Sequence, residues 1–197
     1  MSRLVFLLEE YSAKVLLDGF LPRLFPNLAF LCVPHEGKQD LEKSIPRKLK
    51  AWREPGVRFV ILRDNDGADC RELKAKIEAL THVRERSQPL VRIACQEIEA
   101  WYLGDVGALA TGFGKEPLRG LPEKERFRDP DAVVQPSRAI EELIAEFQKV
   151  SGARRMAGML SREGNRSRSF QVFVDGIARL AAQVTGLRGS RQPDSPS

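Results

Sequence analysis

The amino-acid sequence predicts an α/β fold with a mostly parallel, four-stranded sheet flanked by helices. Four short apolar runs alternate with segments whose apolar residues recur at helical spacing, and this alternation is typical of parallel sheets. No short turn joins two consecutive apolar runs, so antiparallel hairpins are not expected. With 197 residues, of which 42% are hydrophobic and 30% are charged, the chain is long enough to bury a core.

The first apolar run, Leu4–Leu8, is continuous and ends at once in charge, which indicates a strand buried on both faces. The strands are expected at Leu4–Leu8, Leu28–Val33, Val57–Leu62 and Leu90–Cys95. Helices are expected from Ser12 to Pro22, over Leu41–Trp52, over Arg71–Leu80 and from Glu97 to Leu103. Ser12 is expected to cap the first helix, because a serine hydroxyl can accept a hydrogen bond from an amide of the first turn.

The character of the chain changes after the fourth strand and its helix. Residues 1–110 are expected to form the core domain, and residues 111–136, rich in glycine, proline and charge, a surface loop or linker. Helices are expected at Ser137–Val150, Ala153–Leu160 and Phe170–Ala182, with Ser137 as a cap, and they make residues 137–188 a helical C-terminal part. The composition of residues 189–197 is typical of a disordered tail.

Carboxylates follow three of the four predicted strands. In open parallel sheets ligands bind at the carboxyl ends of the strands, and a D-x-D on an extended strand would point both aspartates to one side. Converging carboxylates raise one another's pKa, and a divalent cation with oxygen ligands relieves the repulsion. The predicted ligands of Mg²⁺ or Mn²⁺ are Glu9, Asp64, Asp66 and Glu99.

Such a metal could polarise a phosphodiester and generate hydroxide near neutral pH. The residues expected to carry the catalysis are Glu9, Asp64 and Asp66, with Glu9 as a ligand or a general acid/base. A structural interpretation stays open, because strands end at the surface and Asp66-Gly67 is a common turn sequence. Glu97 and Glu99 diverge on a helix, so only one is expected to face the site, and Glu99 is preferred.

The basic residues are most concentrated late in the chain. The net charge of +5, from 32 Lys and Arg against 27 Asp and Glu, permits a nucleic-acid partner without establishing one. Guanidinium groups suit phosphate geometry, although a solvated loop or a protein contact is an equal alternative. The late candidates for phosphate contact are Arg154, Arg155, Arg162, Arg166 and Arg168. Lys38 and Arg63, near the acids, are two more, and Arg63 can equally neutralise the carboxylates.

For several other residues a structural role is preferred over a functional one. His35 is a candidate proton carrier but is more simply a loop residue, and Trp101 is expected in the core rather than stacked on a base. Cys32 and Cys95, in predicted strands, are expected to be inert apolar fillers. No apolar run approaches the length of a membrane span, and the first residues lack the features of a signal peptide. A cytoplasmic protein with no membrane partner is expected.

Five segments of the chain resemble a known family. They are LLEEYSAKVLLDGFLPRL, HEGKQDLEK, FVILRDNDGADC, VRIACQEIEAWYLGD and SRSFQVFVDGI, and together they span most of residues 4–176. A glutamate that closes the first strand and a D-x-D that closes the third are similar to the Toprim pattern of topoisomerases, primases and OLD-family nucleases. More narrowly, the chain resembles the Toprim-like proteins catalogued as domain of unknown function 4276.

The resemblance implies a Toprim-like (Rossmann-like) fold with a helical C-terminal extension. It assigns Glu9 to the Toprim glutamate, Asp64 and Asp66 to the metal-binding D-x-D, and Glu99 to a later acidic position. Such proteins often read E-G-x-S-E after the first strand, whereas this chain reads EEYSA over residues 9–13 and lacks the second glutamate.

The activity implied by the resemblance is that of a metal-dependent nuclease acting on DNA or RNA. The implied setting is a bacterial anti-phage defence complex in which the chain is the effector subunit beside an ATPase. The chain has no G-x-x-x-x-G-K-[ST], so the ATPase would be a separate subunit. A non-catalytic binding or regulatory subunit, phosphoryl chemistry on a nucleotide, and homo-oligomer formation stay open.

Overall fold

The structure, a computed structural model, describes residues 2–83 and 87–189, and the side chains of residue 185 and residues 187–189 are left out. Four strands, β1 (Arg3–Leu8), β2 (Phe30–Pro34), β3 (Val57–Asp64) and β4 (Leu90–Ala94), form one sheet in the order β2-β1-β3-β4. All neighbouring strands are parallel, and β1 in the centre pairs with both β2 and β3. The predicted four-stranded parallel sheet is therefore confirmed.

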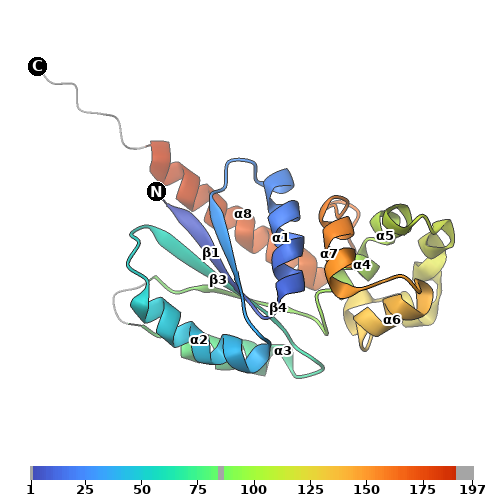
Figure 1. The fold of residues 1–197 in the computed structure, drawn as a ribbon, viewed down its shortest axis with the longest axis horizontal. Coiled ribbons are helices and arrows are strands. Elements are labelled where there is room, and N and C mark those ends of the chain that lie inside the picture. Colours follow the sequence, from blue (N-terminus) through green and yellow to red (C-terminus); the bar gives the residue numbers. More distant parts are fainter. Residues whose placement is uncertain (1, 84–86, 190–197) are drawn as a thin grey trace, which may run out of the picture.

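The helices cover both faces of this sheet. They are α1 (Tyr11–Leu24), α2 (Lys38–Ala51), α3 (Cys70–Leu80), α4 (Ala100–Gly104), α5 (Val106–Phe113), α6 (Pro136–Leu143), α7 (Lys149–Ala157) and α8 (Arg168–Gly189). Figure 1 shows α1 and α8 on one face, α2 and α3 on the other, and α4 to α7 gathered at the end where β4 leads into α4. The start of β1 and the end of α8 both lie at the opposite end of the molecule (Figure 1).

The two faces of β1 explain why its sequence is apolar throughout. Leu4, Phe6 and Leu8 belong to the core under α1 and α8, while Val5 and Leu7 belong to the core under α2 and α3. All five side chains are fully buried. A strand packed on both faces needs apolar residues at every position, and this is the pattern in the sequence.

The predicted ends of the first two helices are wrong in detail. The helix α1 begins at Tyr11 with Glu10 as its N-cap, and the Ser12 hydroxyl donates to Oε1 of Glu10 at 2.6 Å instead of capping the helix. The helix α2 begins at Lys38 rather than at Leu41, and it retains Pro46 in its interior. Its first residue therefore lies at the carboxyl end of the sheet, directly after Gly37 with a φ of 95°.

The predicted helix over Ser137–Val150 is also wrong, because two helices replace it. The helix α6 begins at Pro136, so Ser137 is not its cap, and the chain leaves helical geometry at Ile144. Ile144 and Phe147 are buried in the break, where the Phe147 ring lies 5.9 Å from that of Phe113. The helix α7 then starts at Lys149. The break places Lys149 at the start of a new helix rather than at the end of an old one.

Residues 111–136 are more ordered than the surface loop that was expected. After α5 they form three short 3₁₀ helices, η1 (Glu116–Glu123), η2 (Glu125–Phe127) and η3 (Pro130–Ala132). Leu118, Leu121 and Phe127 are buried in the core that also contains α1 and α8. The division into a core domain and a helical C-terminal part stays a prediction, and residues 190–197 of the predicted tail lie outside the described residues.

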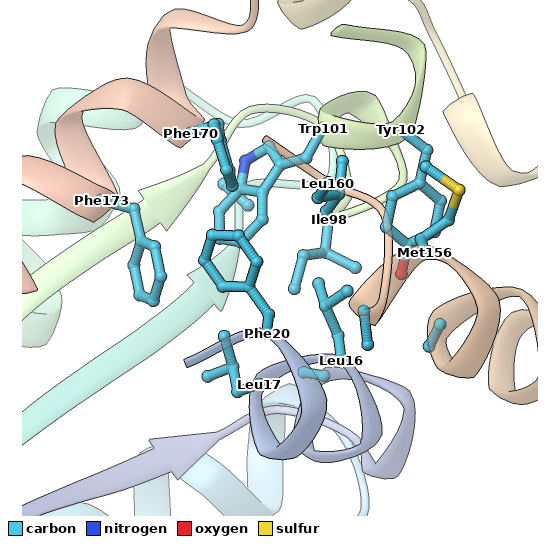
Figure 2. Close-up of a cluster of buried hydrophobic side chains, with 14 of the residues drawn as sticks. Leu16, Leu17, Phe20, Ile98, Trp101, Tyr102, Met156, Leu160, Phe170 and Phe173 are labelled. Atoms are coloured by element: carbon cyan, nitrogen blue, oxygen red, sulfur yellow. The ribbon is translucent and has the colours of Figure 1, made fainter. Parts of the chain in front are cut away.

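An aromatic cluster joins the sheet to the last helix (Figure 2). The centroid of the Trp101 ring system lies 5.3 Å from that of Phe170 and 5.0 Å from that of Phe173. The ring centroids of Phe173 and Phe6, on β1, are 6.5 Å apart. The Trp101 indole donates to the Ser169 hydroxyl at 2.9 Å. Trp101 is fully buried, so its predicted place in the core is confirmed. Among the helices of the described residues, none has the length and apolar character needed to cross a bilayer.

Candidate functional site

The predicted acids converge on the carboxyl end of the sheet, as the parallel topology requires. Glu9 directly follows β1, Asp64 ends β3, and Glu99 lies between β4 and α4. The backbone amide of Asp64 donates to Glu9 Oε2 at 3.3 Å, and the charge of Glu99 is near enough to raise the pKa of Asp64. We call Glu9, Asp64, Asp66 and Glu99 the acidic edge.

The D-x-D does not have the extended geometry that the sequence predicted. The strand ends at Asp64, and Asp66 has a φ of 48°, in the left-handed region that aspartate tolerates better than most residues. Asp64 is buried, whereas the side chain of Asp66 is 39% exposed and pairs with Lys38 at 3.3 Å. The two aspartates therefore lie in different environments, although the charge of Glu9 interacts with the charges of both.

Asn65, between these aspartates, connects the ends of β3 and β4. Its backbone amide donates to the carbonyl of Ala94 at 3.1 Å, and its side-chain oxygen accepts from the amide of Gln96. The amide of Asp66 donates to the Gln96 carbonyl at 3.1 Å, and Gln96 also has a positive φ, of 62°. These bonds fix the tips of two neighbouring strands and so fix the backbone that carries Asp64 and Asp66.

The inner half of the acidic edge is sealed from water. Glu99 is fully buried, and neither of its carboxylate oxygens has a hydrogen-bond partner among the described residues. Burial raises the pKa of Glu99 to about 7, against an opposing effect of Lys149. Burial and then the charge of Glu99 raise the pKa of Asp64 well above its usual range. The Tyr102 hydroxyl, also buried without a partner in the described chain, has a pKa raised by burial and by Glu99.

Lys149 balances this buried charge, and sequence reasoning missed it. Its ammonium lies 3.4 Å from Glu10 Oε1 and 3.9 Å from Glu97 Oε1. Burial lowers the pKa of Lys149, but the acids around it, Glu99 first among them, raise it by more. No spacing in the sequence relates Lys149 to the strand ends, because only the break before α7 brings this residue there. The carboxylates of Glu10 and Glu97 were seen in the sequence, but without this partner.

The outer half of the edge is balanced by Arg63. This residue is buried on β3, and its guanidinium lies 3.1 Å from Glu9 Oε2, 3.4 Å from Asp66 Oδ2 and 3.7 Å from Glu42 Oε1. Burial raises the pKa of Glu9, although Arg63 lowers it. The geometry agrees with the neutralising role that the sequence left open for Arg63. Lys38 is exposed at the mouth of the site.

The late arginines have varied surroundings. Arg155 donates to the Gly112 carbonyl and lies over the Phe113 ring at 5.1 Å, and Arg162 pairs with Asp175. Arg166 donates to the carbonyl oxygens of Arg128, Leu103 and Phe127. Arg154 and Arg168 are exposed on α7 and α8. Within the described chain, no hydrogen bond or ion pair connects these arginines to the acidic edge.

His35 has a structural environment. Its Nδ1 lies 2.8 Å from the Leu8 carbonyl oxygen, and burial lowers its pKa, so the neutral ring is favoured at neutral pH. The ring therefore fastens the end of β2 to that of β1. Its Nε2 is buried and has no hydrogen-bond partner in the described part of the chain.

The side chains of the acidic edge have the ligand type that a hard divalent cation prefers. They offer carboxylate oxygens, and the unpartnered oxygens of Glu99 are the clearest sign of a missing positive group. Mg²⁺ needs only one or two carboxylates when phosphate oxygens complete its shell. Among the described residues, no three His, Cys, Asp or Glu side chains are gathered closely enough to hold a metal by themselves. The residues therefore fit a site that other oxygen ligands would complete, to which Asp64 and Glu99 would contribute carboxylate oxygens.

Comparison with solved structures shows a shared fold. The C-terminal region of the OLD protein of Xanthomonas campestris pv. campestris superposes with a TM-score of 0.55 at 16% identity, over 93% of this chain and 97% of that one. The C-terminal region of the OLD protein of Burkholderia pseudomallei gives 0.55 at 14% identity, over 91% and 99%. A search of curated proteins finds no match. The model of one protein family, by contrast, matches residues 8–178, and the chain therefore belongs to the family described as Domain of unknown function (DUF4276).

Proposed function

We propose that this protein is a metal-dependent nuclease of the Toprim type, which cleaves phosphodiester bonds in DNA or RNA with Mg²⁺ or Mn²⁺. The observation that carries the proposal is the convergence of Glu9, Asp64 and Glu99 at the carboxyl end of the sheet, with Glu99 buried and unpartnered. The fold shared with the C-terminal regions of OLD proteins supports it.

The roles of the residues follow from their environments. Asp64 and Glu99 would hold the metal, which when bound would polarise the phosphodiester. Glu9 has a raised pKa and a hydrogen bond from the Asp64 amide, so it is placed to exchange a proton at the rim of the site. Asp66, exposed and paired with both Lys38 and Arg63, would be released for a ligand role when phosphate takes up both cations.

A cleft beside the acidic edge offers a path for the substrate backbone. It lies between α2 and α3, has a volume of about 600 Å³ and is lined by Lys38, Arg63 and Lys76 among other residues. Lys76 is exposed and pairs with Glu42 at 2.7 Å. Lys38 and Lys76 are themselves exposed, and ion pairs of exposed side chains are weak, so both can exchange their partners for phosphate at little cost. Lys38 and Lys76 are therefore the first phosphate contacts that we assign, ahead of the late arginines.

The test is a cleavage assay on single-stranded and double-stranded DNA and on RNA, with Mg²⁺, Mn²⁺ or EDTA. Asp64→Asn is expected to abolish cleavage and to remove Mn²⁺ binding in calorimetry, because it removes a negative ligand and leaves the side chain's size unchanged. Asp129→Asn is the matched control. It lies far from the cleft and caps η3 by accepting from the amide of Asp131, and asparagine caps as well as aspartate does. Full cleavage by Asp64→Asn would contradict the proposal.

The biological setting is a further part of the proposal. We place the protein as the effector subunit of a bacterial anti-phage defence complex with an ATPase, on the resemblance described above. Co-expression of the chain with an ATPase encoded beside it, followed by affinity purification, tests the association. A plaque assay with the complex carrying Asp64→Asn tests the role, and protection equal to that of the wild type would contradict it.

A second candidate function is a non-catalytic binding or regulatory subunit of such a complex. Two observations favour it: Arg63 and Lys149 already neutralise much of the edge, and residue 13 is alanine where related sequences often have a second glutamate. Retained Mn²⁺ binding without cleavage, even in the assembled complex, would favour this candidate over the nuclease.

A further inference from the structure

Two cysteines lie in contact beside the acidic edge. Cys70 is the first residue of α3, and Cys95 follows the last residue of β4. Their sulfur atoms are 3.7 Å apart, although the residues are separated by 25 positions in the sequence. Both are partly exposed. The strand prediction for Cys95 is wrong by one residue, and its side chain therefore does not fill the core but meets another thiol.

The surroundings of the pair connect it to the tips of β3 and β4. The side-chain amide of Asn65 donates to the sulfur of Cys70 at 3.2 Å and to the carbonyl of Ala68 at 2.6 Å. The oxygen of the same side chain accepts from the amide of Gln96, the residue after Cys95. Asn65 thus holds the two thiol-bearing segments against each other.

We propose that Cys70 and Cys95 are a modification site, at which a hydroperoxide oxidises the two thiols to an intramolecular disulfide. The proposal does not depend on the nuclease function. It rests on the contact of the two sulfurs, on their partial exposure and on the short exposed connection that carries Cys70.

The reaction balances with one equivalent of hydrogen peroxide. The Cys70 thiol gives up its proton, its sulfur attacks one peroxide oxygen and the O–O bond breaks. The sulfur becomes a sulfenic acid, and the departing hydroxide takes up the released proton and leaves as water. The thiol of Cys95 then attacks the sulfenic sulfur, the S–S bond forms, and a second water leaves. Cys70 directly follows the exposed residues 66–69 and is therefore the residue assigned to meet the oxidant, while burial raises the pKa of the Cys95 thiol to about 12.

The structure allows the movement that the bond requires. A disulfide needs a sulfur separation of about 2 Å, so the two atoms must approach by about 1.7 Å from the observed 3.7 Å. Residues 66–69, which lead into α3, are exposed, and the helix is anchored further along by Leu73 and Ile77. The approach therefore has to come from Cys70 and the exposed residues before it, while Leu73 and Ile77 stay in the core.

The third cysteine provides a contrast within the same molecule. Cys32 is buried on β2, and burial raises the pKa of its thiol. It belongs to the core under α1 and α8, whereas Cys70 and Cys95 lie at the carboxyl end of the sheet. Cys32 should therefore stay reduced under conditions that oxidise the pair.

The experiment is native oxidation with hydrogen peroxide, followed by alkylation in denaturant and mass spectrometry. The full chain is expected to fall from three alkylated cysteines to one and to lose about 2 Da as a monomer. Cys32→Ser is expected to fall from two alkylated cysteines to none. Cys70→Ser and Cys95→Ser are expected to form no intramolecular bond, and their reduced forms to match the wild type in circular dichroism.

A second measurement excludes a bond that forms only in unfolded protein. Closing the loop between residues 70 and 95 lowers the entropy of the unfolded chain, so the Tm of the oxidised wild type should rise and that of Cys70→Ser should not change. Three alkylated cysteines after oxidation, a covalent dimer, a mass gain from sulfinic acid, or a fall in Tm would each overturn the proposal.

Discussion

Glu99 is a carboxyl group held in a place where ionisation is unfavourable. In the unfolded chain its pKa is the ordinary one for glutamate, and in the folded protein burial raises it to about 7. Between these two values the folded state binds more protons than the unfolded state, so the free energy of unfolding falls as the pH rises. Below this window the group is protonated in both states and has no such effect.

Glu99→Gln should therefore have a higher free energy of unfolding than the wild type at high pH. Outside the pH range between the two pKa values, the difference between the two proteins should not vary with pH. The gain is expected to grow from pH 4.5 to about 7 and to reach about 3 kcal/mol, from a pKa difference of about 2.5 units. Urea denaturation of both proteins at several pH values measures it. A stability difference that does not vary with pH would show that Glu99 ionises as freely in the folded protein as in the unfolded chain.

Lys149 is the cation on which the inner acids depend. Lys149→Met keeps the length of the side chain and removes the charge, so Glu10, Glu97 and Glu99 lose their shared partner. We expect a loss of about 1–2 kcal/mol at pH 8, less than for a fully buried pair because the lysine side chain is 36% exposed. Chemical denaturation at pH 8 and pH 5 measures the loss, which should shrink at pH 5.

The control for Lys149 is another lysine with an exposed partner. Lys115 lies 3.7 Å from Glu146, and both side chains are exposed. Lys115→Met should change the free energy of unfolding by less than about 1 kcal/mol at either pH, as is usual for surface pairs. Equal effects of the two substitutions would mean that the inner acids do not need Lys149.

At the scale of elements, the break between α6 and α7 depends on close contact at Gly152. A Cβ atom at this position would lie 2.3 Å from Cε2 of Phe147, the aromatic residue buried in the break. Gly152→Ala should therefore displace the ring and destabilise the protein by about 1–3 kcal/mol, despite the better helix propensity of alanine. Thermal or urea denaturation followed by circular dichroism measures the change.

A second helical glycine provides the matched control. Gly186 lies in α8, and no atom would come within 4 Å of an added Cβ. Gly186→Ala should be neutral or stabilising by up to about 1 kcal/mol, since only propensity changes. If Gly152→Ala behaved in the same way, the break would not be held by the packing of Phe147.

The strands could be predicted from the sequence, whereas the break between α6 and α7 could not. The short apolar runs identified all four strands, and the run of β1 is apolar throughout because this strand is buried on both faces. The break at Ile144 was not visible, because Ser137–Val150 has apolar residues at helical spacing throughout. What ends α6 is the burial of Ile144 and Phe147 among distant residues such as Phe113. Lys149 was missed for the same reason, since its position depends on that tertiary contact.

At the scale of the whole molecule, the last helix, α8, packs against the first strand, β1, and helps to bury one face of the sheet. Phe173 of α8 packs against Phe6 of β1, and Val174 and Ile177 belong to the same core. A fragment of residues 1–110 would expose this face of the sheet to water. We expect it to show a non-cooperative thermal transition and little amide protection in hydrogen exchange, whereas a chain ending at residue 189 should unfold cooperatively.

This experiment also tests the domain division that the sequence suggested. A cooperative, well-protected fragment would establish residues 1–110 as an independent domain. The sequence suggested the division because composition changes near residue 110, but composition does not report which face of a sheet a distant helix covers. The position of the acidic edge, by contrast, could be predicted, because parallel strands must bring their carboxyl ends to one edge of the sheet. Their ends, and so Glu9, Asp64 and Glu99, could be placed at one edge of the sheet from the predicted parallel pairing alone.

The position of the two chain ends has a practical consequence. The start of β1 and the end of α8 share one end of the molecule, opposite the carboxyl ends of the strands (Figure 1). A fluorophore, affinity handle or sensor surface attached at the start of β1 or at the end of α8 would lie away from the acids and from the cysteine pair. Protein immobilised there would thus present the acidic edge and the cysteine pair to the solution, and metal, nucleic acid and oxidant could be titrated against one tethered sample.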